Sequence, residues 1–257
     1  MAKTIVMIHG MWCGPWCWSN YRSVFEAAGY RCVAVTLPYH DMKPHGTPDA
    51  QLGTASLLDY SEAIEREIRQ LDEKPILMGH SMGGLLAQIL AARGLAQAVV
   101  LLSPASPAGI MAITPTVIRS LWSIQANWGF WRKPTRLAHF DAVYSSLHLL
   151  QQAEQKKAYD NMVCDSGKAI FEIGYWMFDS RGAAKVDASK VTCPVLVLTG
   201  TQDRLTPVSV VRKVARKYQA VATYKEFDNH AHWIMGEPGW EEVAKYALAW
   251  LESQKLE

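Results

Sequence analysis

The strongest constraint on the fold of this chain is the segment formed by residues 75–94, PILMGHSMGGLLAQILAARG. A short apolar run after a proline predicts a buried strand, whose first residue needs no hydrogen-bond donor. Apolar side chains then recur at helical spacing and stop at Gly94, which predicts a helix ending there. The turn between them is Gly79-His80-Ser81-Met82-Gly83. In so tight a turn, the backbone crowds the positions two before and two after the central residue, and glycine is needed at both. The central residue, Ser81, is held in a strained conformation and projects outward.

Ser81 lies where a helix begins, and the free backbone N–H groups there favour developing negative charge. A Gly-x-Ser-x-Gly spacing also arises by chance in loops, but the flanking strand and helix favour a nucleophile over an ordinary turn serine. The stretch Gly-His-Ser-Met-Gly-Gly resembles the nucleophile elbow of the α/β-hydrolase fold. A serine hydroxyl is a poor nucleophile at neutral pH, so the rest of the chain must supply a base and an orienting acid.

A second mark of this resemblance lies at the end of the first predicted strand. Thr4 to Ile8 is continuously apolar, as in a strand covered on both faces of a parallel sheet, and His9-Gly10 follows it directly. The resemblance implies that the backbone N–H groups of Met11 and Met82 form an oxyanion hole.

The rest of the chain predicts an α/β protein with a mostly parallel sheet flanked by helices, and the resemblance implies that this is the α/β-hydrolase fold. Further strands are expected at 98–102, 195–198 and 223–227. Residues 105–185 break the alternation of strand and helix, and the resemblance implies a helical cap inserted after the strand that ends near Leu102. The hydrolase core would then comprise residues 1–104 and 186–257.

The acid and the base are expected beyond the carboxyl ends of late strands, where catalytic groups of parallel sheets collect. Asp203 follows such a strand in Thr-Gly-x-x-Asp, which resembles the family's acid loop, and Thr206-Pro207 is expected to open the next helix. His232 matches the family's base, with Ala231 in place of the usual glycine. His230 remains a rival base, since residues two apart in an extended loop point the same way. Asp228 is a rival acid, although it is close in sequence to the base.

The N-terminal segment and the inserted segment carry the candidate substrate pocket. Residues 11–30 resemble the plant methylesterase and hydroxynitrile lyase branch of the family. Aromatic rings in the inserted segment indicate an apolar acyl or alcohol pocket, or a set of rings that only holds the cap together. The candidate pocket residues are Trp12, Trp122, Trp128 and Trp176.

Composition excludes several other classes of protein. The 257 residues are 49% hydrophobic and carry a formal net charge of +2, so neither nucleic acid nor an anionic membrane is an expected partner. Transmembrane and signal-peptide patterns are not evident, and a cytoplasmic protein is expected. Five cysteines fit reduced thiols, and the spacing of Cys13 and Cys17 is poor for zinc. No metal or cofactor is expected, and His40 and His45 are expected to be solvated.

Three functions are consistent with these residues. The first is a serine hydrolase, a carboxylesterase, that cleaves carboxylic esters of small apolar substrates through an acyl-enzyme on Ser81. The second is a lyase or carbon–carbon bond hydrolase with the same triad; the related lyases also depend on a lysine and a threonine in the pocket. The third is a ligand-binding protein with a disused site, which the intact Ser81, Asp203 and His232 disfavour. The substrate's chain length and the oligomeric state are not determined by the sequence.

Overall fold

Six strands form one parallel sheet in this structure, a computed structural model that describes residues 2–256. Each strand runs parallel to its neighbours in the sheet. The spatial order is β2 (Arg31–Ala34), β1 (Thr4–Ile8), β3 (Ile76–His80), β4 (Ala98–Leu102), β7 (Val195–Gly200) and β8 (Ala222–Phe227). Parallel neighbours need long crossover connections, which the intervening helices supply.

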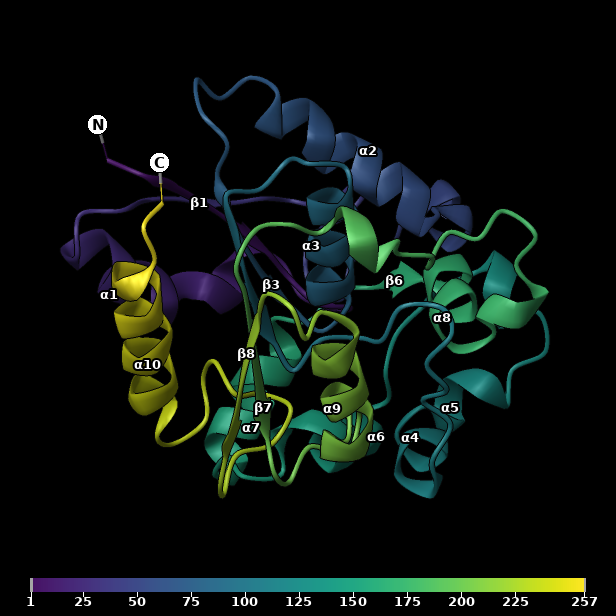
Figure 1. Ribbon diagram of the computed structural model, residues 1–257. Helices are drawn as coiled ribbons and strands as arrows, with labels where there is room; N and C mark the ends of the chain where they lie inside the picture. The colour runs from purple at the N-terminus through teal and green to yellow at the C-terminus, as the bar shows by residue number, and fades with distance from the viewer. Residues whose placement is uncertain (1, 257) are drawn as a thin grey trace.

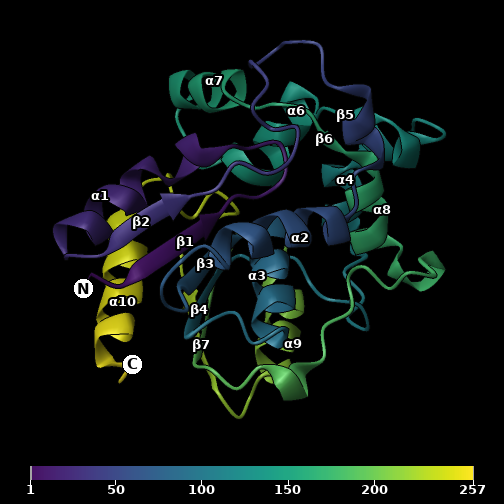
Figure 2. The same ribbon diagram turned by 90° about the horizontal axis from the view of Figure 1, so that it is seen from above.

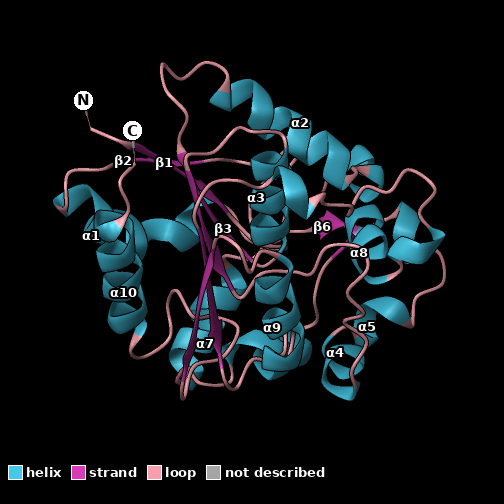
Figure 3. Cartoon of the chain, in the orientation of Figure 1, coloured by secondary structure: helices cyan, strands magenta, loops and turns pink. Residues whose placement is uncertain are grey.

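Helices cover both faces of the sheet, as the continuously apolar strands require. In Figure 1 and Figure 3, α1 and α10 lie on one side of the sheet, and α2, α3 and α9 lie on the other. Their bounds are α1 (Ser19–Ala27), α2 (Leu57–Ile68), α3 (Met82–Ala92), α9 (Val208–Lys217) and α10 (Trp240–Ser253).

The core is divided by the sheet because successive strand residues point to opposite faces. Ile5, Met7 and Met78 belong to one buried cluster, together with side chains of α1 and α10. Val6 and Leu77 belong to the other, with side chains of α2, α3 and α9. The predicted α/β-hydrolase architecture, a mostly parallel sheet flanked by helices, is confirmed.

Residues 105–185, here called the inserted segment, leave the sheet after β4 and return before β7. Figure 2 shows their elements gathered along one side of the molecule. The segment contains α4 (Pro115–Ser120), α5 (Trp122–Gln125), α6 (His139–Ala142), α7 (Gln152–Asp160), α8 (Gly167–Gly174) and a small antiparallel pair, β5 (Pro134–Thr135) with β6 (Asp165–Ser166). Within residues 2–256, no helix has the length and apolar character needed to cross a membrane.

Short helical turns complete the described elements. They are η1 (Pro15–Trp18), η2 (Ala50–Thr54), η3 (Phe130–Arg132), the π-helical turn η4 (Val143–Leu147), η5 (Trp176–Phe178) and η6 (Ala188–Lys190).

Candidate active site

Ser81 lies in the turn between β3 and α3 with φ +54° and ψ −120°, a conformation that L-residues rarely adopt. Such strain costs on the order of 1–3 kcal/mol and persists only where the surroundings enforce it. A Cβ at Gly79 would lie 2.2 Å from the carbonyl oxygen of Gly83, and a Cβ at Gly83 would lie 2.1 Å from that of Ile8. Both glycines are therefore required by close approach of the backbone, as the sequence predicted.

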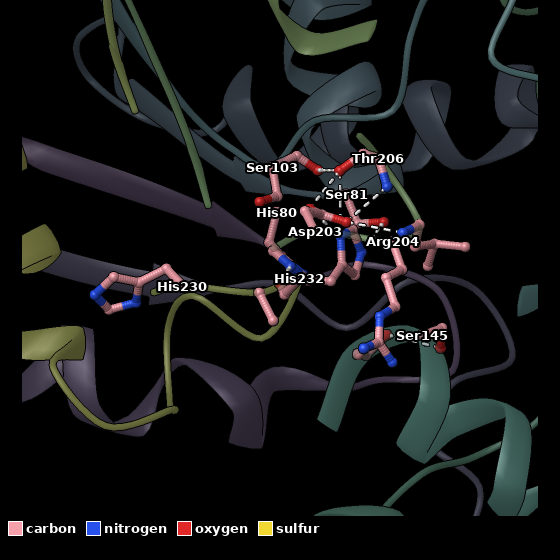
Figure 4. A network of polar contacts seen from close by, with 12 residues as sticks. His80, Ser81, Ser103, Ser145, Asp203, Arg204, Thr206, His230 and His232 are labelled. Atoms are coloured by element: carbon pink, nitrogen blue, oxygen red, sulfur yellow. Dashed lines mark hydrogen bonds and ion pairs between the residues drawn. The ribbon is translucent and has the colours of Figure 1, made fainter. Parts of the chain in front are cut away.

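Three side chains from separate strand ends meet at this turn (Figure 4). His232 Nε2 lies 3.0 Å from Ser81 Oγ, and His232 Nδ1 lies 2.8 Å from Asp203 Oδ2. All three residues are buried. The arrangement is that of a nucleophile, a base within hydrogen-bond reach, and an acid that orients the base.

Asp203 is held by donors that the sequence did not predict. Its Oδ1 accepts hydrogen bonds from the backbone N–H groups of Leu205 (2.9 Å) and Thr206 (2.7 Å), and the Thr206 hydroxyl lies 2.7 Å from its Oδ2. Burial by itself raises the pKa of Asp203, but the adjacent His232 and the bonds from Thr206 more than compensate and lower it below the ordinary value. The carboxylate is thus kept ionised beside the imidazole.

The expected helix start at Thr206-Pro207 was wrong in detail. Helix α9 begins at Val208 with Pro207 as its N-cap, and Thr206 lies outside the helix. Its hydroxyl lies 3.1 Å from the Ser103 carbonyl oxygen and 3.2 Å from His232 Nδ1, in addition to its contact with Asp203. Thr206 therefore links the loops after β4 and β7 rather than capping a helix.

The two histidines after β8 point in different directions, because a series of turns begins at His232 and the loop is not extended there. His230 Nδ1 lies 3.0 Å from Glu237 Oε1, and Figure 4 shows its ring directed away from Ser81. Asp228 is exposed. Neither of these rivals lies with the residues that surround Ser81.

His80, inside the turn, supports the loop that carries His232. Its Nε2 lies 2.8 Å from the His232 carbonyl oxygen, which can only accept, so Nε2 carries the proton. The two rings are 4.8 Å apart between centroids. Burial, followed by the nearby His232, lowers the pKa of His80 to about 3. Burial, followed by His40, also lowers the pKa of His9 to about 3. Both rings stay neutral at neutral pH.

These two neutral histidines predict acid destabilisation. The unfolded chain binds a proton at each site near pH 6.5, whereas the folded chain does so only near pH 3. Their contribution to stability is thus present above pH 6.5 and is lost as the pH falls from there toward 3. We expect each to remove about 2 kcal/mol from the free energy of unfolding between pH 7.5 and pH 5. Between pH 7.5 and pH 5, the free energy of unfolding of His80→Asn, measured by denaturant titration, should therefore fall by about 2 kcal/mol less than that of the wild type. An equal fall in the two proteins would contradict the prediction.

His40 is not solvated, contrary to the expectation from the sequence, whereas His45 is exposed. His40 Nε2 lies 3.0 Å from Asp165 Oδ2, and both side chains are completely buried. Burial lowers the pKa of His40, but Asp165, together with the Pro38 carbonyl and Asp41, outweighs burial and raises this pKa above its ordinary value. The loop that carries His40 lacks periodicity, and Asp165 stands in no recognisable motif, so nothing in the sequence indicated their pairing.

Two cavities adjoin Ser81, and Met11 lines both. The larger, about 250 Å³, is almost entirely apolar and is roofed by side chains of α4, α5 and α8. Met82 also lines it. As the first residue of α3, Met82 has a backbone N–H without an intrahelical acceptor. The smaller cavity, about 20 Å³, is bounded by His232, Ser146 and Trp233 and has room for one water-sized group.

Of the four tryptophans expected in the pocket, only Trp12 is in the lining of either cavity. The larger cavity is lined by Val117 and Leu121, which are four residues apart and lie on one helical face. Trp122 is the next residue along the chain, so its side chain points in a different direction. Trp122 and Trp128 are exposed, at 59% and 86%, and Trp176 packs against the buried cluster that includes side chains of α2, α3 and α9. The pocket walls are mainly aliphatic.

The described cysteines do not form a metal site. All five thiols are free, and Cys13 and Cys17 are buried. Across residues 2–256, no group of three His, Cys, Asp or Glu side chains is placed to hold a metal ion.

A model of the alpha/beta hydrolase family matches residues 5–246, and the chain belongs to this family. Among curated proteins, Methylesterase 7 of Arabidopsis thaliana is 34% identical over 92 residues, which cover 35% of this chain and 34% of that protein. Polyneuridine aldehyde esterase of Rauvolfia serpentina is 32% identical over 85 residues, which cover 32% of this chain and 31% of that protein. These matches thus span about a third of the length of the relatives.

Solved structures resemble the whole chain. The monoacylglycerol lipase of Paleococcus ferrophilus superposes with a TM-score of 0.70 at 25% identity, over 97% of this chain and 94% of that one. A methylesterase from Arabidopsis superposes with a TM-score of 0.73 at 13% identity, over 98% of this chain and 100% of that one, and shows the shared fold alone.

Proposed function

We propose that this chain is a carboxylesterase that hydrolyses small apolar esters through an acyl-enzyme on Ser81. The observation that carries the proposal is the hydrogen-bonded series Ser81, His232 and Asp203, which borders an apolar cavity. The partial similarity to a methylesterase and to polyneuridine aldehyde esterase supports it.

The reaction proceeds in two steps. His232 takes the Ser81 proton as Oγ attacks the ester carbonyl, and Asp203 holds the imidazole and stabilises its positive charge. The N–H groups of Met11 and Met82 bind the oxyanion; one such donor is worth about 3 kcal/mol in other serine hydrolases. His232 then protonates the departing alcohol. Water attacks the acyl-enzyme with His232 again as base, which releases the acid and restores the Ser81 hydroxyl.

The two cavities assign the two halves of the ester. Because His232 protonates the leaving oxygen, the alcohol group must lie on the side of His232, which lines only the smaller cavity. The acyl group then occupies the larger cavity, beneath the inserted segment acting as a cap. We therefore propose esters of a short alcohol with an apolar acid.

A pair of isomeric esters tests this assignment. Methyl hexanoate carries its apolar chain on the acyl side, whereas pentyl acetate carries it on the alcohol side. We expect kcat/KM for methyl hexanoate to exceed that for pentyl acetate by roughly tenfold or more. The acyl chains differ by four methylenes, and burial of only two of them is worth about 1.6 kcal/mol. Equal rates, or faster cleavage of pentyl acetate, would reverse the assignment of the cavities.

The alternative functions give different results in the same experiment. If Ser81 reacts with a fluorophosphonate but neither ester is cleaved, the lyase or carbon–carbon hydrolase is favoured. If Ser81 neither reacts nor supports turnover, the chain is a binding protein. Neither cavity has a lysine among its described lining residues, which favours ester hydrolysis over the chemistry of the lysine-dependent lyases.

A further inference from the structure

The backbone of Trp12, directly after Met11, is held on both sides by the inserted segment. Its N–H donates to Asp165 Oδ2 at 2.9 Å, and its carbonyl oxygen accepts from the Val163 N–H at 2.9 Å. Trp12 has a φ of +60°, which is uncommon for a bulky residue and costs energy unless the surroundings enforce it. The contacts from residues 163 and 165 supply that enforcement.

The Asp165 carboxylate is fully buried, accepts three hydrogen bonds and forms an ion pair with His40. Oδ2 accepts from the Trp12 N–H and lies 3.0 Å from His40 Nε2. Oδ1 receives the Tyr60 hydroxyl (3.2 Å) and the Ser166 N–H (2.6 Å). A carboxylate has an acceptor oxygen on both sides for these donors and for His40, whereas an amide of the same shape has an acceptor on one side only. The site is thus built for an ionised aspartate.

His40 provides the charge that makes a buried carboxylate tolerable. Its Nδ1 lies 3.0 Å from the Pro38 carbonyl oxygen, which only accepts, and its Nε2 faces the carboxylate of Asp165. A donor at Nδ1 and a carboxylate beside Nε2 suit the imidazolium form, which carries a proton on each ring nitrogen. Three distant parts of the chain meet here: the loop after β1, the loop after β2, and β6 of the inserted segment.

The loop after β1, which is hydrogen-bonded to Asp165 through Trp12, packs closely against Ser81. A Cβ at Gly10 would lie 2.9 Å from Ser81 Cβ, so the chain before Met11 has almost no room to move toward the elbow. Met11 itself lines both cavities beside Ser81. Met11 thus lies between residue 10, which is confined by Ser81, and residue 12, which is hydrogen-bonded to Asp165.

We propose that Asp165, paired with His40, is a positioning residue that holds the Met11 N–H at the place where the oxyanion forms. This role rests on the proposed function. It couples the inserted segment to the chemical step, because the segment that roofs the acyl cavity also orders one half of the oxyanion hole.

Asp165→Asn is the decisive variant. It keeps the size of the side chain but turns an NH₂ group toward one of the two donor pairs. We expect kcat for methyl hexanoate to fall by about 100-fold, comparable to the loss of one oxyanion donor, with KM changed by less than about threefold. The inhibition constant for a trifluoromethyl ketone, which forms a tetrahedral oxyanion on Ser81, should rise in parallel with the loss of kcat/KM.

Asp141→Asn is the matched control. Asp141 is also fully buried in the inserted segment and paired with an arginine, Arg119, but it contacts the Ser123 N–H rather than the Trp12 loop. If Asp165 only stabilised the fold, Asp165→Asn and Asp141→Asn would lower the thermal stability by similar amounts, and kcat per folded molecule would be unchanged in both. A kcat for Asp165→Asn no lower than that of Asp141→Asn would overturn the proposal.

His40→Gln decides the matter if Asp165→Asn does not fold. It retains a donor toward Asp165 but removes the charge, and we expect a fall of at least tenfold in kcat with little change in KM; an unchanged kcat would overturn the proposal. A wild-type protein without ester turnover would overturn the proposed function itself. If the wild type cleaves the ester and the Asp165→Asn and His40→Gln variants cleave it with an unchanged kcat, only the positioning role is overturned.

Discussion

Ser81→Ala should lower ester turnover by about 10⁵-fold or more, the loss seen when the nucleophile is removed from other serine triads. The reason is that the Ser81 hydroxyl lies 3.0 Å from His232 Nε2, and no second hydroxyl among residues 2–256 is hydrogen-bonded to that nitrogen. The measurement is kcat for methyl hexanoate, with mass analysis of the 75–94 region after treatment with a fluorophosphonate. The label should be found on Ser81 in the wild type and be absent from the variant.

Ser103→Ala is a suitable control for this variant. Ser103 lies at the end of the adjacent strand β4, is buried, and also has a positive φ, +43°. Its hydroxyl makes no hydrogen bond within the described residues. The substitution should leave turnover within a few-fold of the wild type. Turnover by Ser81→Ala comparable to that of Ser103→Ala would refute the acyl-enzyme mechanism.

His232→Ala should reduce kcat by about 10⁵-fold as well, because Ser81 then has no base and the leaving alcohol no acid. His230→Ala should retain most of the turnover, since the His230 ring contacts Glu237 rather than Ser81 or Asp203. Its effect should instead be on stability, by about 1–3 kcal/mol, because Glu237 loses a buried partner. Kinetics per folded molecule and thermal unfolding of both variants separate the two effects. If His230→Ala abolished turnover and His232→Ala did not, the assignment of the base would be reversed.

The fold was predictable because its signals are local. Residues 4–8 and 76–80 are apolar without interruption, which identifies strands buried on both faces, and each is followed by a turn of characteristic composition. The tight approach of Gly79 and Gly83 to neighbouring backbone leaves glycine as the only residue at those positions. The family match and the parallel sheet confirm these predictions.

The predictions that failed concerned side-chain environment. His40 was expected in solvent, since its loop has no periodicity, yet a carboxylate 125 positions along the chain encloses it. Trp122 and Trp128 were expected in the pocket because of their size, yet they face outward, and aliphatic side chains line the cavity. Neither hydrophobicity nor spacing specifies which way a ring turns in an irregular segment.

By itself, the sequence determined the strands of the sheet, the helices that flank them and the strained serine turn, because each depends on residues within a few positions. Asp203 and His232 became candidate partners through local motifs that resemble those of the hydrolase family. Only the tertiary structure decided that His232 faces Ser81 while His230 does not, that Thr206 holds Asp203, and that Asp165 grips the loop after Met11. Those contacts join residues far apart in the chain, and their geometry follows from how loops and the inserted segment pack on the sheet. A hydrogen bond requires placement within a few tenths of an ångström, and only the packed structure specifies position that closely.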